Sequence, residues 1–211
     1  MKKLLLVFSV VVTVAANLGA QTTFFNLYGS NVGEEGTHVA NVPGGGYVVA
    51  GGTDAAGFGS RDIAVWQINA NGSIAWCRKL GTVDWEWVLD IVPIASGGYY
   101  VAMESWDPTN VAPYPVTTVT KLDVNGNVVW TRRYNPPPNT TYARGLDIAT
   151  TFNGGFILLT QEDSGFANTQ RVKLISCNSS GGVLWSKKFM VSEMYFGNNI
   201  AQCTNGDIVA A

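Results

Sequence analysis

The sequence is poor in charge, in histidine and in paired cysteines. Charged residues make up 13% of the chain, about half the usual share for a soluble domain, and His38 is the single histidine. The three cysteines, Cys77, Cys177 and Cys203, contain no Cys-x-x-Cys pair, which excludes a cysteine-rich zinc motif. Their odd number predicts buried free thiols, with a Cys177–Cys203 disulfide as the alternative.

Long apolar runs are also absent, except at the N-terminus. Lys2 and Lys3 precede an apolar run from Leu4 to Ala16, and small residues lead to Ala20. This order predicts a secretory signal peptide over residues 1–20, with a retained signal anchor as the alternative. We expect an exported protein with no membrane span after cleavage. Without the two lysines, 11 basic residues stand against 15 acidic ones, and no basic patch predicts a nucleic-acid partner.

The chain does have a repeat of about 50 residues, marked by two phrases. A glycine-aromatic phrase recurs at spacings of 52, 57 and 52 residues, beginning at Gly45, Gly97, Gly154 and, in a weaker form, Gly206. A glycine-containing turn followed by tryptophan recurs at spacings of 54 and 55 residues, ending at Trp76, Trp130 and Trp185. With so little helical pattern, this period favours a propeller.

Each repeat divides into four short strands, which is the content of one propeller blade. The predicted strands are 37–42, 47–50, 62–68 and 74–80, then 88–94, 99–104, 116–122 and 127–134, then 144–150, 156–161, 171–176 and 183–189, with two more in 198–211. Residues 22–29 resemble 76–81 and predict a lone outer strand. We predict an all-β fold: a β-propeller of four-stranded antiparallel blades that is incomplete, with about three full blades plus partial first and last blades.

The predicted organisation is a signal peptide over 1–20 and a partial β-propeller over 21–211. The blades span about 33–85, 86–140, 141–192 and 193–211, and residues 22–30 form the outer strand of a ring-closing blade. Because a ring usually needs 4–8 blades, we expect a missing C-terminal portion to close it. The repeated tryptophans are expected to lie between neighbouring blades.

One polar position recurs on the first strand of each repeat. It is occupied by His38, Asp90, Asp147 and Asn199. First strands line the central channel of a propeller, so these side chains are predicted to converge and bind a cation or a small ligand. The alternative is that they only solvate a water-filled channel. No Gly-x-Ser-x-Gly elbow accompanies the histidine, which argues against a serine-based triad.

Acidic and aromatic groups supply the remaining candidates. The acid pairs Glu34–Glu35, Asp84–Glu86 and Glu162–Asp163 contain the two carboxylates that a glycosidase needs, but we predict solvated loop residues. Asp54 and Asp62 lack the spacing of a calcium loop, so no catalytic residue, metal or cofactor is predicted. The aromatic residues Trp85, Trp87 and Trp106 predict either a carbohydrate-stacking platform or ordinary core packing.

The repeat phrases resemble those of secreted β-propeller proteins from Bacteroidetes-type bacteria. The resemblance rests on Asp62 to Gly81, on Lys121 to Trp130 and on the glycine-aromatic phrases, and it covers nearly all of 22–211. Such proteins often carry a C-terminal type IX secretion sorting domain, which this sequence lacks. The resemblance implies display at the cell surface and supplies no catalytic residue.

These observations together predict an exported, non-catalytic β-propeller module for binding, adhesion or surface display. Its expected partner is a glycan or a protein at the cell surface. One alternative is a carbohydrate-active or other hydrolytic propeller enzyme with its site at the channel mouth. Another is an adhesive scaffold that binds no small ligand.

Overall fold

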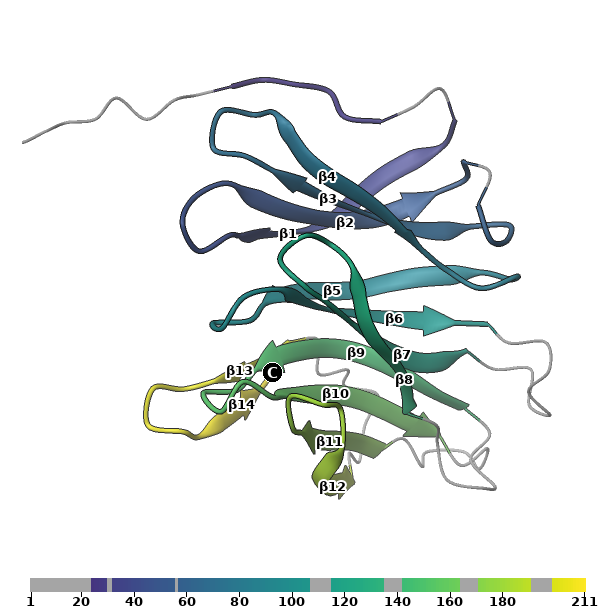
Figure 1. Cartoon of the computed structure of the whole chain (residues 1–211). Helices are drawn as coiled ribbons and strands as arrows, with labels where there is room; N and C mark the ends of the chain where they lie inside the picture. Colours follow the sequence, from purple (N-terminus) through teal and green to yellow (C-terminus); the bar gives the residue numbers. More distant parts are fainter. Residues whose placement is uncertain are drawn as a thin grey trace, which may run out of the picture.

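The computed structural model describes residues 24–29, 32–55, 57–106, 115–134, 142–163, 171–190 and 199–211. These residues form three four-stranded antiparallel sheets and a final two-stranded hairpin, with no helix among them. In Figure 1 the three sheets lie one above another in the order of the sequence. Within the described part of the chain, no helix is long and apolar enough to cross a membrane.

Each sheet takes its four strands from one sequence repeat, and neighbours in the chain are neighbours in the sheet. The first sheet contains β1 (Glu34–Asn41), β2 (Tyr47–Thr53), β3 (Asp62–Ile68) and β4 (Ile74–Leu80). The second contains β5 (Glu86–Pro93), β6 (Tyr99–Ser105), β7 (Val116–Leu122) and β8 (Val128–Tyr134). The third contains β9 (Tyr142–Thr150), β10 (Phe156–Asp163), β11 (Arg171–Cys177) and β12 (Val183–Met190). The hairpin contains β13 (Ile200–Gln202) and β14 (Ile208–Ala210).

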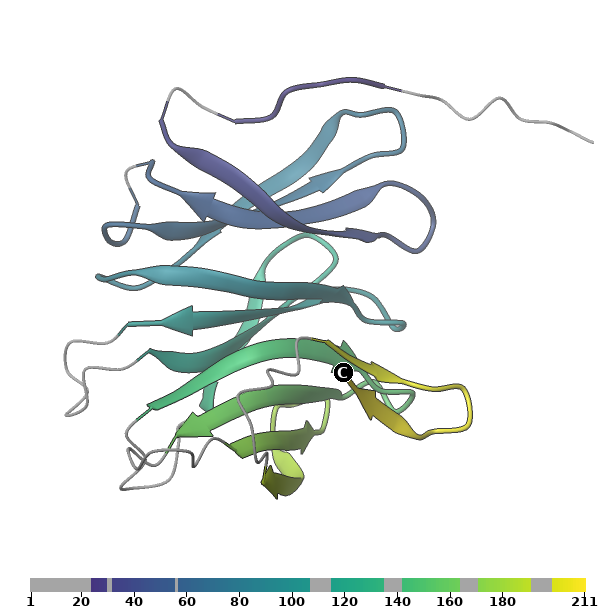
Figure 2. The ribbon, with the colours of Figure 1, turned by 180° about the vertical axis from the view of Figure 1, so that it is seen from behind.

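This arrangement confirms the all-β prediction and the four-stranded antiparallel unit. The strand bounds agree with the predicted ones to within a few residues, and the largest differences are at β1, β2 and β5. The first strands β1, β5, β9 and β13 contact one another in succession. Figure 2 shows the hairpin beside β9, with the C-terminus at Ala211 close to it. The sheets do not close into a ring. The predicted signal peptide, residues 1–20, lies outside the described residues.

Glycine makes the turn between the last two strands of each sheet possible. Gly72, Gly126 and Gly181 have φ angles of 84°, 76° and 79°, which a residue with a Cβ adopts only with strain. Each glycine N–H donates to the carbonyl three residues earlier, at 2.9–3.1 Å, and the strand ladder shifts by one residue beside the turn. A type I turn followed by a left-handed residue produces this geometry. The glycine-containing turns predicted before Trp76, Trp130 and Trp185 are confirmed.

The apolar core lies between consecutive sheets. Strand β6 shows how the sequence produces it, because alternate residues of a strand point to opposite faces. Tyr99, Val101 and Met103 pack toward the first sheet, whereas Tyr100 and Ala102 pack toward the third. All five are buried. A third cluster joins the third sheet to the hairpin. The second sheet is therefore covered on both faces by its neighbours, and the third by the second sheet and the hairpin.

Two of the three repeated tryptophans lie between sheets, as predicted. Trp76 packs edge-on against Tyr99 of the second sheet, with ring centroids 5.8 Å apart. Trp130 lies against Phe156 of the third sheet at 6.2 Å. Trp185 has 41% of its surface exposed, so no equivalent packing covers it among the described residues. The three positions are equivalent in sequence, but only the first two have a described sheet beside them.

Residues 24–29 do not form the predicted lone strand, because no described strand lies beside them to pair with. They nevertheless take the position of one. Tyr28 Oη donates to Gly72 O at 2.6 Å, and Phe24 meets the Tyr47 ring edge-on at 6.2 Å. Arg78 of β4 makes the equivalent contact one repeat later, with Nε 2.9 Å from Gly126 O. Residues 24–29 therefore pack over the turn at Gly72 in the same way that β4 packs over the turn at Gly126.

All three cysteines are free. Cys177 is buried, as predicted, but Cys203 is only half-buried and Cys77 is exposed. Cys177 and Cys203 form no disulfide, so the alternative pairing is wrong. Burial raises the pKa of the Cys177 thiol to about 11, which keeps it protonated and unreactive near neutral pH.

Candidate functional site

A β-bulge precedes the recurring polar residue on each complete first strand. The strand ladder shifts between Gly36 and His38 in β1, and between Val88 and Asp90 in β5. In β9 the shift falls between Gly145 and Asp147. A bulge places two residues opposite one and so redirects the next side chain. The same local irregularity therefore sets the direction of His38, Asp90 and Asp147.

The four predicted polar residues line one cavity of about 530 Å³, which we call the first-strand cavity. His38, Asp90 and Asp147 reach it from β1, β5 and β9, and Asn199 reaches it from the residue before β13. Asn199 holds its place by exchanging two backbone hydrogen bonds with Ala211, at 3.0 and 3.1 Å. The structure thus brings together all four residues that the repeat selected.

The two carboxyl groups of this cavity are held by backbone amides. The Ile91 N–H donates to Asp90 Oδ1 at 2.7 Å, and the Ile148 N–H donates to Asp147 Oδ1 at 2.8 Å. Asp147 Oδ2 also accepts from the N–H of Ile200, at 2.6 Å. That last bond joins the third sheet to the hairpin. Asp147 is therefore a structural bridge as well as a member of the cavity.

Burial and mutual proximity change how this site titrates. The pKa of the Asp90 carboxyl is raised to about 7, mainly by burial; the hydrogen bond from the Ile91 N–H opposes this rise, and the neighbouring Asp147 carboxyl adds to it. Burial lowers the pKa of His38, against an opposing effect of the Asp147 charge. Near neutral pH the His38 imidazole is therefore mostly neutral, and the Asp90 carboxyl is protonated in about half of the molecules.

The chemistry available here is hydrogen bonding more than metal ligation. No group of three His, Cys, Asp or Glu side chains converges as metal ligands in the parts of the chain that the structure describes. The cavity offers carboxyl oxygens, the Asn199 and Gln202 amides and an imidazole, over walls that include Leu89 and Leu146. Polar groups make up most of the accessible lining of this cavity, which suits a ligand rich in hydrogen-bonding groups.

The three candidate tryptophans lie near one another, and each is close to half exposed. The Trp106 N–H donates to the Trp85 carbonyl at 2.9 Å. The Arg61 guanidinium lies over Trp87 at 5.4 Å and over Trp85 at 5.9 Å from the ring centroids, within cation–π range. Core packing therefore does not account for their position. A sugar stacking on these rings would have to share them with Arg61.

The acid pairs were predicted as solvated loop residues, and the structure contradicts this: Glu34 and Glu35 begin β1, and Glu86 and Glu162 lie in strands and are buried. Glu86 begins β5 and is fully buried, and Glu162 lies in β10 with 4% of its surface exposed. Burial alone would raise the pKa of Glu162, but hydrogen bonds from Lys188 and Lys173 outweigh it and lower that pKa. This carboxylate is a structural ion pair between strands.

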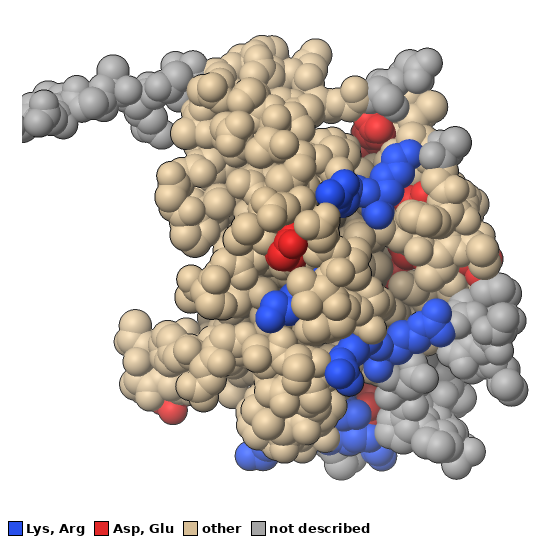
Figure 3. Space-filling view, viewed as in Figure 1, with Lys and Arg blue, Asp and Glu red and all other residues tan. Residues whose placement is uncertain are grey.

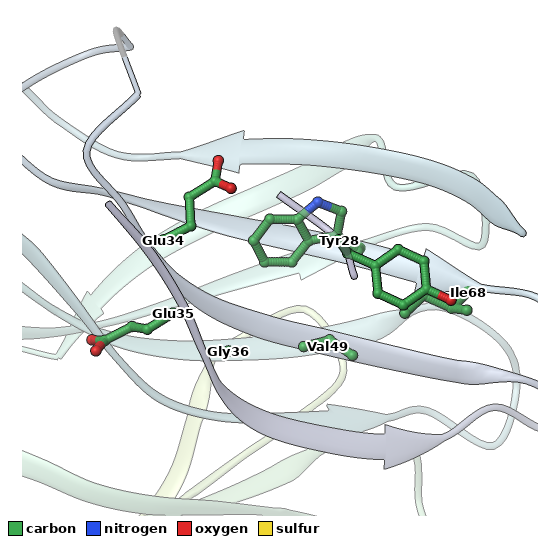
Figure 4. Close-up of a pocket in the computed structure, with 7 residues that line it drawn as sticks. Tyr28, Glu34, Glu35, Gly36, Val49 and Ile68 are labelled. Carbon is green, nitrogen blue, oxygen red and sulfur yellow. The ribbon is translucent and has the colours of Figure 1, made fainter. Parts of the chain in front are cut away.

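Glu34 and Glu35 line the end of a small apolar pocket of about 160 Å³ on the first sheet, together with Tyr28 and Val49. Figure 4 shows their two carboxyl groups pointing away from each other. Glu35 forms an ion pair with Arg61 instead. The two residues are adjacent in sequence, but they do not form the facing pair that glycoside hydrolysis needs.

Basic residues occur as pairs on the outer strands, including Arg132 and Arg133 on β8 and Lys187 and Lys188 on β12. Figure 3 shows lysine and arginine side chains spread down this face of the molecule, with uncharged surface and some acidic side chains between them. The absence of a nucleic-acid partner stays a prediction.

Comparison with known proteins adds no identity. Neither a protein-family model nor a curated protein sequence matches the chain. Function is therefore inferred from the geometry of the first-strand cavity.

Proposed function

We propose that this protein is an exported, non-catalytic module of the propeller type that binds a small, hydrogen-bonding ligand in the first-strand cavity. The observation that carries the proposal is the convergence of His38, Asp90, Asp147 and Asn199 on one cavity. Its volume of about 530 Å³ lies within the range of small-molecule sites, about 300–1,000 Å³. The sequence similarity to secreted Bacteroidetes-type propellers supports export and surface display.

The ligand class follows from the polar groups of the cavity. Asp147 presents oxygen acceptors, Asp90 presents an oxygen and a shared proton, and Asn199 presents an amide that both donates and accepts. A ligand with several adjacent hydroxyl groups can satisfy acceptors and donors together. We therefore propose the terminal sugar of a cell-surface glycan as the ligand.

Ligand-observed NMR with a panel of neutral, acidic and amino sugars tests this proposal. We expect saturation transfer to at least one sugar, lost in Asp147→Asn and reduced in Asp90→Asn. Trp87→Ala is the matched control, because it removes the aromatic platform and leaves the cavity intact. Transfer that survives Asp147→Asn and disappears in Trp87→Ala would assign binding to the platform. Transfer to no sugar would contradict the proposed ligand class.

One observation favours a hydrolytic function as a second candidate. The hydrogen-bonded pair Asp90 and Asp147, with one pKa raised toward neutral, resembles carboxyl pairs that share a proton in acid–base catalysis. Peptide or ester turnover that is abolished by Asp90→Asn would establish this candidate. The backbone amides that occupy both Asp147 oxygens favour binding over turnover.

A further inference from the structure

A second pair of carboxyl groups lies buried where the first sheet meets the second. It is located at the N-terminal end of β3, away from the turn at Gly72 that joins β3 to β4. Asp62 begins β3 and is 1% exposed, and Glu86 begins β5 and is 0% exposed. Gly81 lies between them, directly after β4. We call this region the acidic pocket and define it by Asp62, Gly81, Thr82 and Glu86.

Each of these two carboxyl groups has one oxygen with a hydrogen-bond donor and one without. Asp62 Oδ2 accepts from the Phe58 N–H at 2.9 Å, and Glu86 Oε1 accepts from the Thr82 hydroxyl. Asp62 Oδ1 and Glu86 Oε2 are fully buried and have no hydrogen-bond partner among the residues that the structure describes. Native proteins rarely leave buried carboxylate oxygens in this state unless something else contacts them.

The two unpartnered oxygens point toward the same place. A Cβ built on Gly81 would lie 2.2 Å from Asp62 Oδ1 and 2.9 Å from Glu86 Oε2. The two oxygens therefore lie at most about 5 Å apart, a separation that one cation bridges at the 2.3–2.6 Å distances typical of calcium. The missing side chain at position 81 leaves the space between them open.

A cavity of about 200 Å³ continues from this pocket and shares Gly81 and Thr82 with it. Ser105 and Thr118 line the cavity, and their hydroxyl oxygens are also buried without a partner. Lys79 lines the cavity as well, and its ammonium group donates to Ala55 O at 3.3 Å. The cavity therefore offers further oxygen atoms and room for water beside the carboxyl pair.

The fold does not require a carboxyl group at this position. Asp62 pairs with Thr53 at the end of β2, and the equivalent residue of the second sheet, paired with Ser105, is Val116. Val116 is buried and apolar. The second sheet thus forms the same strand with a valine, so the buried acid of the first sheet has another role.

We propose that the acidic pocket binds a divalent cation, Ca²⁺, between Asp62 Oδ1 and Glu86 Oε2. Calcium prefers oxygen ligands and accepts irregular coordination, and a divalent charge balances two buried carboxylates. The described residues hold no group of three acidic, His or Cys ligands, so hydroxyl, backbone and water oxygens complete the shell. With only two carboxylates, affinity is expected in the weak range, about 10⁻⁴–10⁻³ M.

Thermal unfolding with CaCl₂, MgCl₂ or EDTA tests the proposal. We expect 10 mM Ca²⁺ to raise the Tm of the wild-type chain by about 3–10 °C, and Mg²⁺ to raise it less. Asp62→Asn and Glu86→Gln should each lose this shift while keeping the volume of the side chain. Asp54→Asn is the control, because Asp54 is an exposed carboxylate beside Arg61 and should leave the shift unchanged.

Terbium luminescence gives an independent readout that does not depend on stability. Trp85 and Trp87 flank Glu86 in the sequence, so exciting tryptophan should sensitise Tb³⁺ bound in the pocket. We expect the emission to fall at least tenfold in Glu86→Gln and to be displaced by Ca²⁺. An unchanged Tm and no displaceable emission would overturn the proposal.

Discussion

Two pairs of carboxyl groups lie between neighbouring sheets of this protein, one pair half-buried and the other fully buried, and their surroundings differ. In the first-strand cavity, Asp90 and Asp147 accept hydrogen bonds from three backbone amides and face an open space. In the acidic pocket, Asp62 and Glu86 each keep one fully enclosed oxygen without a donor. The described backbone thus supplies donors to the first pair, whereas the second pair keeps two oxygens that the proposed cation would contact.

The difference shows that burial alone does not define the role of an acid. Backbone amides fix Asp90 and Asp147 and still leave them accessible to a ligand. The enclosure of Asp62 and Glu86 costs free energy without compensation from hydrogen bonds. Substitutions at the two pairs should therefore change stability in opposite directions when divalent cations are removed.

The largest effect is expected for Asp147→Ala in the first-strand cavity. This change leaves the N–H groups of Ile148 and Ile200 without an acceptor and removes the bond between the third sheet and the hairpin. We expect the free energy of unfolding to fall by about 3 kcal/mol, since charged hydrogen bonds contribute about 1.5–3 kcal/mol each. Urea denaturation measures this loss. Asp147→Asn, which retains one acceptor, should lose less than the alanine variant.

The second-largest effect is expected in the pH dependence of stability that Asp90 causes in the first-strand cavity. Asp90 keeps its proton in the folded state up to about pH 7 but releases it near pH 4 when unfolded. Its stabilising contribution is present below about pH 4 and is lost as the pH rises to about 7. After allowance for solvent screening, we expect the free energy of unfolding to fall by about 1–2 kcal/mol between pH 4 and pH 7. The fall should be smaller in Asp90→Asn. Urea denaturation at several pH values measures this.

Three other groups must be controlled in that experiment, and the first is Glu86, because burial raises its pKa as well. Burial raises the pKa of Glu104 to about 7, so Glu104 also loses its stabilising contribution as the pH rises. Glu104→Gln should remove this part of the pH dependence. Burial lowers the pKa of His38, so its contribution has the opposite sign and is lost as the pH falls below about 6.5. A stability that is level between pH 4 and 7 in the wild type would contradict the Asp90 assignment.

The acidic pocket should respond in the opposite direction. In EDTA, Glu86→Gln keeps the acceptor for the Thr82 hydroxyl, removes a buried charge and supplies an N–H₂ group toward Asp62. We expect stability to rise by about 1 kcal/mol in urea denaturation without cations. In CaCl₂ the order should reverse, with the wild type the more stable. A variant that is less stable in both buffers would show that Asp62 Oδ1 and Glu86 Oε2 do have hydrogen-bond donors in the folded protein.

The smallest effect is expected outside both pairs. Asp54 is half exposed and lies 3.6 Å from the Arg61 guanidinium. Exposed ion pairs contribute little, so Asp54→Asn should change stability by less than about 0.5 kcal/mol. The same denaturation experiment supplies this value. A larger loss would mean that charge near the first sheet acts over a longer range than the comparison assumes.

The sequence predicts the strands and the first-strand site well because both follow from the repeat. The glycine turns fix the ends of the strands, and the repeat alignment places Asp90, Asp147 and Asn199 in equivalent positions. The bulges that aim these residues leave only a weak sequence signal, since Leu89 and Leu146 are ordinary strand residues. The closure of the sheets into a ring stays a prediction.

The acidic pocket escapes sequence reasoning because it is an exception to the repeat. Asp62 and Glu86 are 24 residues apart, and the Asp84–Glu86 pair suggests a solvated loop. The signal that could have revealed it is the substitution of an acid at the position where the second repeat has Val116. Burial of Glu86 depends on how the first two sheets meet, which no single strand specifies.

Residue-specific ¹³C NMR of the Asp90 carboxyl group against pH tests the central claim most directly, namely that equivalent first-strand residues form one coupled site. The account predicts a titration midpoint near pH 7 in the wild-type chain, which moves to lower pH in Asp147→Asn. A midpoint near pH 4 that is the same in both proteins would show that the two carboxyl groups do not meet, and would contradict the account.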